Sequence, residues 1–117
     1  MKTAYVLFKK NELVGCYFAR SRAARLVDEH LGSGLFAPGW EGDKKGDYEI
    51  VKCEVAYDKI YIVPIKGKRP RIYPSLDALT DYLKSHDIKI KKKNTRPTSF
   101  RVETSRGEVR GKVINVK

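Results

Sequence analysis

The sequence predicts an α+β fold of two small ββαβ-like modules, with antiparallel sheet, two helices and a C-terminal β-hairpin. Short runs of strand-forming residues recur along the chain, and two stretches of apolar residues at helical spacing interrupt them. The order strand, turn, strand, helix, strand occurs twice. A chain of 117 residues can bury a core without metals or disulfides. We therefore expect a neutral module over residues 1–58 and a basic module over residues 59–117.

The first module is expected to open with a hairpin and a helix. Residues 4–8 and 13–18 are rich in strand formers, and the polar stretch between them can turn the chain. Apolar residues then recur at helical spacing. Ser21 is a candidate N-cap, or the helix begins a residue or two earlier, and Gly32 suits the residue that follows its C-terminal end.

A long glycine-rich loop is expected over residues 32–47, and it contains Phe36 and Trp40. Loops of this length in small domains are often functional, and exposed aromatic residues are typical anchors of protein interfaces. Phe36 and Trp40 are therefore candidates for protein interaction. After the loop, residues 47–56 alternate in polarity and predict a strand.

The second module is expected to repeat the hairpin and the helix. Residues 59–65 predict a strand in which Pro64 should sit at an edge or a bulge, because proline has no N–H to donate. Residues 66–70 predict a basic turn, and residues 71–73 predict a short strand. Ser75 is a candidate N-cap for the helix that follows.

The chain is expected to end in three strands. The helix should end near Asp87, and residues 88–93 then alternate isoleucine with lysine before a lysine run. In a strand, this alternation separates an apolar face from a cationic face. Residues 99–104 and 108–116 flank a Ser-Arg-Gly turn and predict the C-terminal hairpin.

An internal repeat supports the prediction of two modules. Residues 5–31 and 61–87 superpose without a gap at an offset of 56 and share the order of their elements. The identical pairs are Tyr5 and Tyr61, Lys10 and Lys66, Tyr17 and Tyr73, and His30 and His86. Either the modules arose by duplication, or two hairpin-plus-helix units look alike because this arrangement is an economical way to build a small fold.

The entry into each helix follows a pattern. Residues 72–79 read IYPSLDAL, and residues 15–24 of the first module also lead from a strand into a helix. These stretches resemble the strand-turn-strand-helix nuclease-associated modular DNA-binding repeats of homing endonucleases, and the resemblance implies DNA binding. The chain departs from those repeats because the alanine after Ser75 comes one position early and because residues 88–93 predict a strand where a second helix is expected. Small size and basic charge also suit a phage accessory protein.

The charge of the chain is segregated. Residues 1–58 contain nine Lys and Arg and nine Asp and Glu, so this half is neutral. Residues 59–117 contain sixteen Lys and Arg against five Asp and Glu, so this half carries the whole net charge of +11. Such asymmetry indicates contact with a polyanion, most often nucleic acid.

Alternation along the last three expected strands predicts one cationic face. Its cations are Lys89, Lys91, Arg101, Arg110 and Lys112. Further basic residues are expected to rim this face, namely Lys66, Lys68, Arg69, Arg71, Lys92, Lys93 and Arg96. A surface of this kind suits contacts with phosphates. Lysines on an edge strand also blunt strand pairing, and this is the competing explanation.

The sequence contains no arrangement typical of catalysis or metal binding. The P-loop and nucleophile-elbow patterns are absent. His30 and His86 lie far apart, each near the end of an expected helix, where histidine commonly interacts with the last carbonyls. Cys16 and Cys53 form no paired motif and are expected to be buried reduced thiols. We expect no enzyme activity, no cofactor and no metal.

Nothing in the sequence predicts contact with a membrane. No apolar run approaches the roughly 20 residues needed to span a bilayer. The first residues do not resemble a signal peptide, since a short apolar stretch ends at a pair of lysines. A cytoplasmic location is therefore expected.

Two functions are consistent with these observations. The first is a non-catalytic nucleic-acid-binding protein, with DNA favoured over RNA and contacts directed mostly at the backbone, because lysines outnumber arginines in the basic half. The alternative is a phage-type inhibitor or adaptor whose basic face meets an acidic host protein. Tyr73 and Phe100 are expected to be buried rather than to stack on bases.

Overall fold

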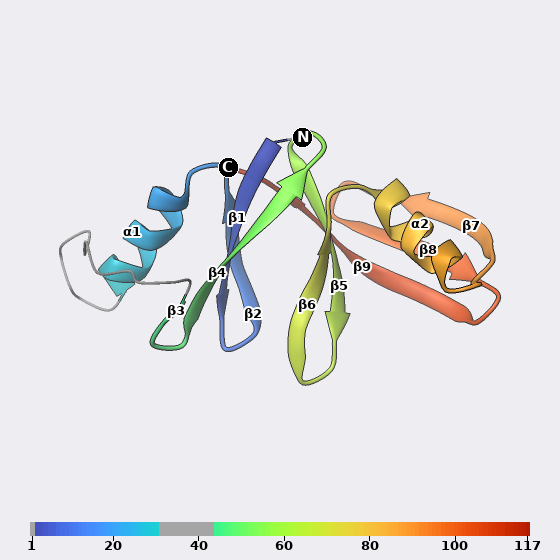
Figure 1. Ribbon diagram of the computed structural model, residues 1–117, viewed down its shortest axis with the longest axis horizontal. Coiled ribbons are helices and arrows are strands. Elements are labelled where there is room, and N and C mark those ends of the chain that lie inside the picture. Colours follow the sequence, from blue (N-terminus) through green and yellow to red (C-terminus); the bar gives the residue numbers. More distant parts are fainter. Residues whose placement is uncertain (1, 31–43) are drawn as a thin grey trace.

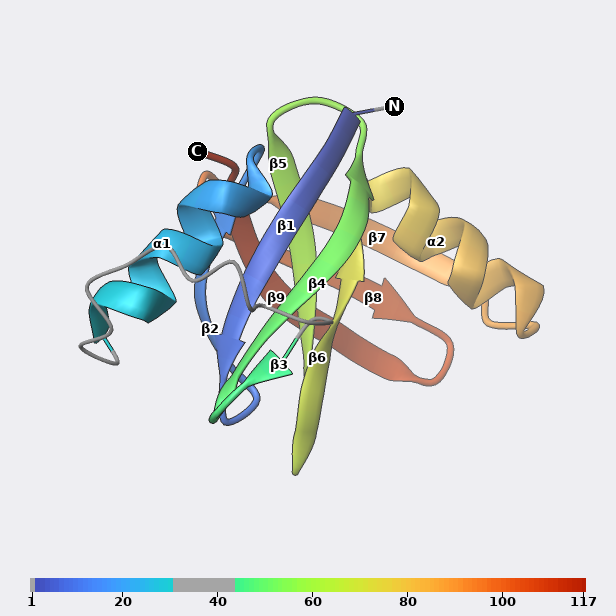
Figure 2. The ribbon, with the colours of Figure 1, turned by 60° about the vertical axis from the view of Figure 1, so that its left-hand side comes forward.

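The computed structural model describes residues 2–30 and 44–117, which form two antiparallel sheets with one helix on the outer face of each (Figure 1). The layers follow one another as helix, first sheet, second sheet, helix, and Figure 2 shows the two helices on opposite sides of the paired sheets. The chain therefore has the α+β class that the sequence predicts.

The first sheet and its helix come from the first half of the chain. The strands, in their order across the sheet, are β2 (Glu12–Tyr17), β1 (Lys2–Lys9), β4 (Tyr48–Val55) and β3 (Lys44–Lys45). The helix α1 spans Arg20–His30. The turn between β1 and β2 has positive φ at both Lys10 and Asn11, the conformation that matches the twist of a two-residue hairpin.

The second sheet and its helix come from the second half. The strands, in their order across the sheet, are β6 (Lys68–Tyr73), β5 (Lys59–Ile65), β9 (Gly107–Asn115), β8 (Ser99–Thr104) and β7 (Ile90–Thr95). The helix α2 spans Leu76–Ser85. β7 is an edge strand of this sheet, and Figure 1 shows β7, β8 and the first part of β9 lying to one side of the first sheet.

The two sheets pack face to face through a shared apolar core. Ala4, Val6 and Phe8 of β1 contribute from the first sheet, and Ile60 and Ile62 of β5 contribute from the second. The other buried members are Cys16, Val55 and Val116. Because each sheet supplies part of this core, neither half of the chain can bury its inner face alone.

Each helix covers the outer face of one sheet. α1 buries Ala23 and Val27 against Leu7 of the first sheet. α2 buries Leu79 against Phe100 of the second sheet. Within the described ranges, no helix is long and apolar enough to cross a membrane.

The two halves have equivalent strand pairings. β1 lies between β2 and β4, and β5 lies between β6 and β9. Tyr5 pairs with Tyr17 in the first hairpin, and Tyr61 pairs with Tyr73 in the second, 56 residues later. The register shifts after Leu7 in the first hairpin and after Val63 in the second, in each case two residues beyond the first tyrosine of the pair. The offset of 56 residues that relates the two sequences therefore also relates equivalent strand pairings in the two hairpins.

β9 joins the two parts of the second sheet at a place where only glycine fits. Up to Lys112 it pairs with β8, and from Lys112 onward it pairs with β5. A Cβ built on Gly111 would lie 2.1 Å from the backbone oxygen of Ile62 and 2.4 Å from a ring carbon of Phe100. Real Cβ atoms do not come this close to their neighbours, so the crossing of β9 over β5 requires a residue without a side chain.

Two features that the sequence predicted from single residues, an N-cap and a bulge, are confirmed. The Ser75 hydroxyl accepts a hydrogen bond from the Ala78 N–H at 3.1 Å, so Ser75 is the N-cap of α2. The register between β5 and β6 shifts between Val63 and Ile65, so Pro64 sits at a bulge as its missing N–H demands.

The structure decides one expected boundary in the hairpin-plus-helix units and corrects another. The Arg22 N–H donates to the Ala19 carbonyl and α1 begins at Arg20, so the earlier of the two expected helix starts is confirmed and Ser21 lies inside the first turn. Gly67, with φ of +73°, closes a two-residue turn, so the expected basic turn over residues 66–70 is mostly strand β6.

Two other boundaries also differ from the expectation. The strand expected over residues 88–93 begins at Ile90, because residues 86–88 complete the C-terminal cap of α2. The loop expected over residues 32–47 ends in the short strand β3, which Gly46 allows to fold back on β4 with φ of +59°. Phe36 and Trp40 lie outside the described residues.

The C-terminal cap of α2 uses a residue other than glycine in the left-handed conformation. The Ile88 N–H donates to the Leu83 carbonyl and the Asp87 N–H to the Lys84 carbonyl, which is a Schellman motif. Asp87 occupies the position that favours glycine, with φ of +60°. Its side chain therefore imposes a conformational cost at this position.

Replacing Asp87 by glycine is expected to stabilise the protein by about 0.5–1 kcal/mol, because glycine adopts this backbone conformation without a steric penalty from Cβ. The change in the free energy of unfolding can be measured by urea denaturation. Asp87→Ala is the control and should not stabilise the protein, since alanine keeps the Cβ. A lower midpoint for the glycine variant than for the native protein would contradict the assignment.

Both cysteines of the inter-sheet region are free thiols. Burial raises the pKa of the Cys16 thiol to about 12, and the nearby Cys53 adds a smaller contribution in the same direction. Burial also raises the pKa of Cys53. Both thiols therefore stay protonated at neutral pH and act as small apolar side chains.

Candidate nucleic-acid interface

Most cations predicted to form one basic surface lie around β7 and on the neighbouring strands. Six exposed cations lie in β7 or beside it, and we call this group the β7 ridge. Its members are Lys84, Lys89, Lys91, Lys92, Lys93 and Arg96. Among the described residues, only Lys93 of these six takes part in an ion pair, with 3.9 Å between its Nζ and Oδ1 of Asp77.

A bulge in β7 divides the run of three lysines between two sides. The register shifts between Ile90 and Lys92, so Lys92 pairs with Glu103 and Lys93 pairs with Val102. Residues that pair directly share a face of the sheet. Lys92 therefore projects from the face opposite α2, whereas Lys93 projects on the side of α2, where it reaches Asp77.

Lys89 and Lys91 do not join the face on which they were expected. Together with Lys84 they line a hollow of about 800 Å³ between the C-terminal end of α2 and β7. The expectation was wrong because it assumed unbroken alternation from residue 88, whereas the strand starts at Ile90 and is then interrupted by the bulge. The ridge consequently presents cations on both sides of one edge strand.

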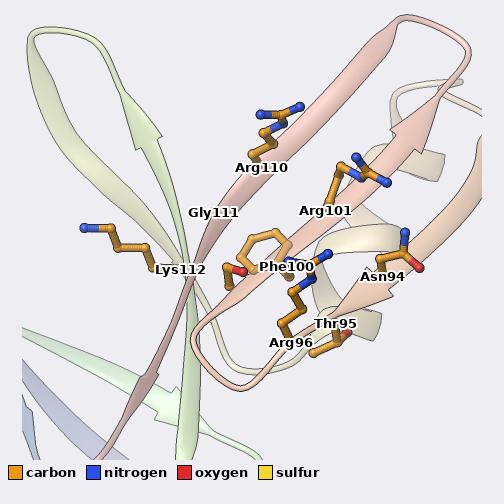
Figure 3. A pocket seen from close by; sticks show the side chains of 9 residues that line it. Asn94, Thr95, Arg96, Phe100, Arg101, Arg110, Gly111 and Lys112 are labelled. Carbon is orange, nitrogen blue, oxygen red and sulfur yellow. The ribbon is translucent and has the colours of Figure 1, made fainter.

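The face of β8 and β9 turned away from α2 carries the arginines that the alternation predicted. Arg101 and Arg110 pair directly across the two strands, and Figure 3 shows their side chains projecting on the same side. They line a second hollow of about 630 Å³. Its other lining residues are Asn94, Thr95, Arg96, Ser99, Phe100, Gly111 and Lys112. We call this hollow and its rim the open face.

A single carboxylate joins the two arginines of the open face. Glu108 accepts a hydrogen bond from Nε of Arg110 at 2.8 Å on one oxygen, and its other oxygen forms an ion pair with Nε of Arg101 at 2.9 Å. Glu103 lies further from Nη2 of Arg101, at 3.7 Å. With its amide oxygen turned toward Arg101, Asn94 accepts a hydrogen bond from the same Nη2 at 3.3 Å.

Arg69 and Arg71, which were expected at the rim, are engaged elsewhere. Nη1 of Arg69 lies 2.6 Å from Oε1 of Glu49, which connects β6 of the second sheet to β4 of the first. Arg71 lies over the ring of Tyr82, 5.0 Å from its centroid. Hydrogen bonds to Tyr73, and then to Tyr82, raise the pKa of Arg71 above its ordinary value. Arg69 therefore links the sheets, and Arg71 links β6 to α2.

Lys66 and Lys68 are exposed but lie apart from the ridge. Lys66 is in the turn between β5 and β6, and Lys68 is the first residue of β6. Figures 1 and 2 both show this hairpin tip pointing away from β7. The structure places Lys68 with Arg69 and Arg71 in the lining of one hollow, but it brings neither lysine to the β7 ridge.

Phe100, the aromatic residue among those that line the open face, does not expose its ring for stacking. Phe100 lies on the side of the sheet that faces α2, where it is buried and contacts the ring of Tyr61 edge-on. Tyr73 is half-buried in the same core and lies beside Tyr82. Both rings are thus packed, as the sequence led us to expect.

Sequence reasoning missed five polar or charged residues of this surface. Lys84 was assigned only to the helix, although its position in the last turn faces β7. Asn94, Thr95 and Ser99 carry no charge and gave no signal, yet all three line the open face. Glu108 was considered only as one of the acidic residues in the net charge. Its position two residues before Arg110 was the available signal, because residues at this spacing share one face of a strand.

Comparisons with models of protein families, with curated proteins and with solved structures find no match for this chain. Residues 90–95, where the nuclease-associated repeats would continue as a second helix, form strand β7. Inference about function therefore rests on the geometry and charge of the surface itself.

Proposed function

We propose that this protein is a non-catalytic nucleic-acid-binding protein that contacts phosphates through the β7 ridge and the open face. The observation that carries the proposal is the set of six exposed cations on both sides of one edge strand, with a single long ion pair among them in the described residues. Unpaired exposed cations are available to replace the counterions that surround a nucleic acid, and this exchange supplies most non-specific affinity.

The cations are more numerous than protection of an edge strand requires. Lysines within β7 discourage pairing with another sheet. However, Lys84 belongs to α2, Lys89 precedes the strand and Arg96 follows it, so these three do not guard the edge. Their position beside the strand supports a binding role for the whole ridge.

Most of the ridge is lysine, which favours contact with the backbone over reading of bases. Lysine presents a point charge, whereas arginine presents a planar fork that matches the edge of a guanine or a phosphate. Five of the six ridge cations are lysines. We therefore favour DNA backbone contacts of low sequence specificity.

We also propose that the two halves arose by duplication of one unit. The equivalent strand orders, the paired tyrosines and the shared offset of 56 support this origin. Among the described residues, only the second half has the further strand β7. The strand that distinguishes the halves is thus the one that carries the basic ridge.

The proposal is tested by fluorescence anisotropy of labelled duplex DNA, single-stranded DNA and RNA, titrated with the intact protein at several salt concentrations. We expect micromolar binding that weakens steeply with salt. If about five phosphates are contacted, log K should fall against log salt with a slope of about −4.5 for duplex and about −3.5 for a single strand.

The absence of binding at about 0.1 M salt would contradict the proposal, because exposed charges still act over roughly 10 Å at this ionic strength. That result would favour the alternative, an inhibitor or adaptor with an acidic protein partner. A slope near zero with measurable binding would also contradict contact with the backbone.

A further inference from the structure

The hollow of the open face has the composition of an anion site. Its lining includes four cations, Arg96, Arg101, Arg110 and Lys112, and none of the residues that line it is acidic. Asn94, Thr95 and Ser99 add an amide and two hydroxyls around the same space. Donors of this kind, converging on a hollow without a carboxylate in its wall, match the oxygens of a phosphate group.

The two central arginines repel each other unless a negative charge lies between them. Arg101 and Arg110 are directly opposite each other on neighbouring strands. Like charges in this position destabilise a sheet. Glu108 compensates for the repulsion, because each of its oxygens forms an ion pair with the Nε of one arginine, at 2.9 Å for Arg101 and 2.8 Å for Arg110.

This shared carboxylate also sets the direction of both guanidinium groups. Nε of each arginine faces Glu108, and among the terminal nitrogens Nη2 of Arg101 also contacts Glu103 and Asn94. Within the described residues, those of Arg110 make no hydrogen bond or ion pair, and its side chain is 72% exposed. The Glu108 side chain is 29% exposed, and Glu108 is not among the residues that line the hollow.

We infer that the hollow binds one phosphodiester group of a nucleic-acid strand between Arg101 and Arg110, and that Glu108 is the positioning residue that aims them. The inference rests on the proposed function and assigns it a defined contact. The β7 ridge lies along the approach to this hollow, since Arg96 belongs to both. A strand held at the hollow can therefore continue along the lysines of β7.

A phosphate site held by Glu108 should make the removal of this negative charge weaken the binding of nucleic acid. Removing a carboxylate from a surface that binds a polyanion normally strengthens binding, because repulsion decreases. Replacing Glu108 by glutamine should weaken it instead. A glutamine amide can accept from one Nε but presents its NH₂ group to the other, so one arginine must turn away.

The matched control is Glu103→Gln. Glu103 lies on the same face, loses the same charge on substitution, and makes only the contact at 3.7 Å with Arg101. We expect Glu108→Gln to weaken binding of a labelled oligonucleotide about five- to tenfold, the effect of losing one well-placed charge-assisted contact. Glu103→Gln should leave binding unchanged or strengthen it.

The salt dependence separates loss of a phosphate contact from a general loss of structure. Loss of one contact should reduce the slope of log K against log salt by about 0.7–0.9 in Glu108→Gln only. Thermal unfolding of both variants checks that the fold is kept. If both variants strengthen binding alike, or if the slope of Glu108→Gln is unchanged, the phosphate site is overturned while binding by the ridge remains.

A second measurement distinguishes the source of the phosphate. The arginine Nε–H signals of intact ¹⁵N-labelled protein are followed by NMR while inorganic phosphate is added, and oligonucleotides with and without a 5′-phosphate are compared. We expect the Arg101 and Arg110 signals to shift together and the two oligonucleotides to bind equally, as an internal phosphodiester requires. Tighter binding of the 5′-phosphorylated strand would show that the hollow binds a terminal phosphate and would contradict its assignment to an internal phosphodiester.

The two proposals fail in different ways. If inorganic phosphate shifts both arginine signals but no oligonucleotide binds, the nucleic-acid function is overturned and with it the phosphodiester. If oligonucleotides bind but neither arginine signal responds to them, the site is overturned and the function stands. If nothing binds and no signal shifts, both are overturned.

Discussion

Replacing Lys91, Lys92 and Lys93 together by glutamate is expected to abolish binding of nucleic acid. The substitutions change the charge of the ridge by six units and place anions on both sides of β7, where the native strand presents cations. At about 0.1 M salt we expect the affinity to fall by at least about a hundredfold, because several phosphate contacts become repulsive. Anisotropy with the nucleic acid that the native protein prefers measures the loss.

The fold should survive this change. All three lysines are exposed, and the ion pair of Lys93 with Asp77 is long, at 3.9 Å, between side chains that are largely in solvent. Exposed pairs of this kind contribute about 0–1 kcal/mol to stability. Circular dichroism and thermal unfolding of the variant should therefore resemble those of the native protein.

The control for net charge places the same substitutions on the first sheet. Lys2, Lys9 and Lys10 are exposed on β1 and its turn, and their replacement by glutamate changes the total charge equally. We expect this variant to lose at most a few-fold in affinity, since long-range attraction between exposed charges is screened. Equal losses in both variants would refute the ridge as the binding surface and leave only an effect of net charge.

Replacing Gly111 by alanine is expected to cause a larger loss of stability than the same change at any other glycine among the described residues. The added Cβ would lie 2.1 Å from the Ile62 backbone oxygen and 2.4 Å from the Phe100 ring. The ring can move only within the core beneath α2, and the carbonyl belongs to the paired strand β5. Overpacking of this kind costs about 1–3 kcal/mol, and contact with backbone places the expected loss at the upper end.

Gly15→Ala is the matched control for this prediction. Gly15 also lies in a strand, but a Cβ there meets only the side chain of Tyr17, with 2.6 Å to its hydroxyl. The tip of a tyrosine can move, so the free energy of unfolding should fall less than in Gly111→Ala. Urea denaturation of the two variants compares the losses. A midpoint for Gly111→Ala equal to that of the native protein would show that β9 does not need glycine at its crossing.

Much of the fold could be predicted from neighbouring residues. The Ser75 cap, the bulge at Pro64 and the C-terminal hairpin each depend on residues within a few positions of one another. The two helices were predicted within a residue or two of their observed ends for the same reason. The start of α1 was left open between Ser21 as the N-cap and an earlier position, because it depends on where the preceding strand ends.

The candidate site was predicted less completely, because membership of a surface depends on long-range pairing. Arg101 and Arg110 were assigned to one face from their alternation, and the structure places them there. Arg69 and Arg71 were assigned to the rim from their charge, but Glu49 and Tyr82 engage them. No short stretch of sequence contains both partners of either contact.

The amino-acid sequence by itself determined the class of fold, the order of the elements and the segregation of charge into the second half. These properties follow from composition and from hydrogen bonding between residues close along the chain. Only the tertiary structure decided which cations share a surface, since a one-residue bulge in β7 moves every later side chain to the other face. It also decided that Glu108 holds two arginines, because that contact needs β8 and β9 in register.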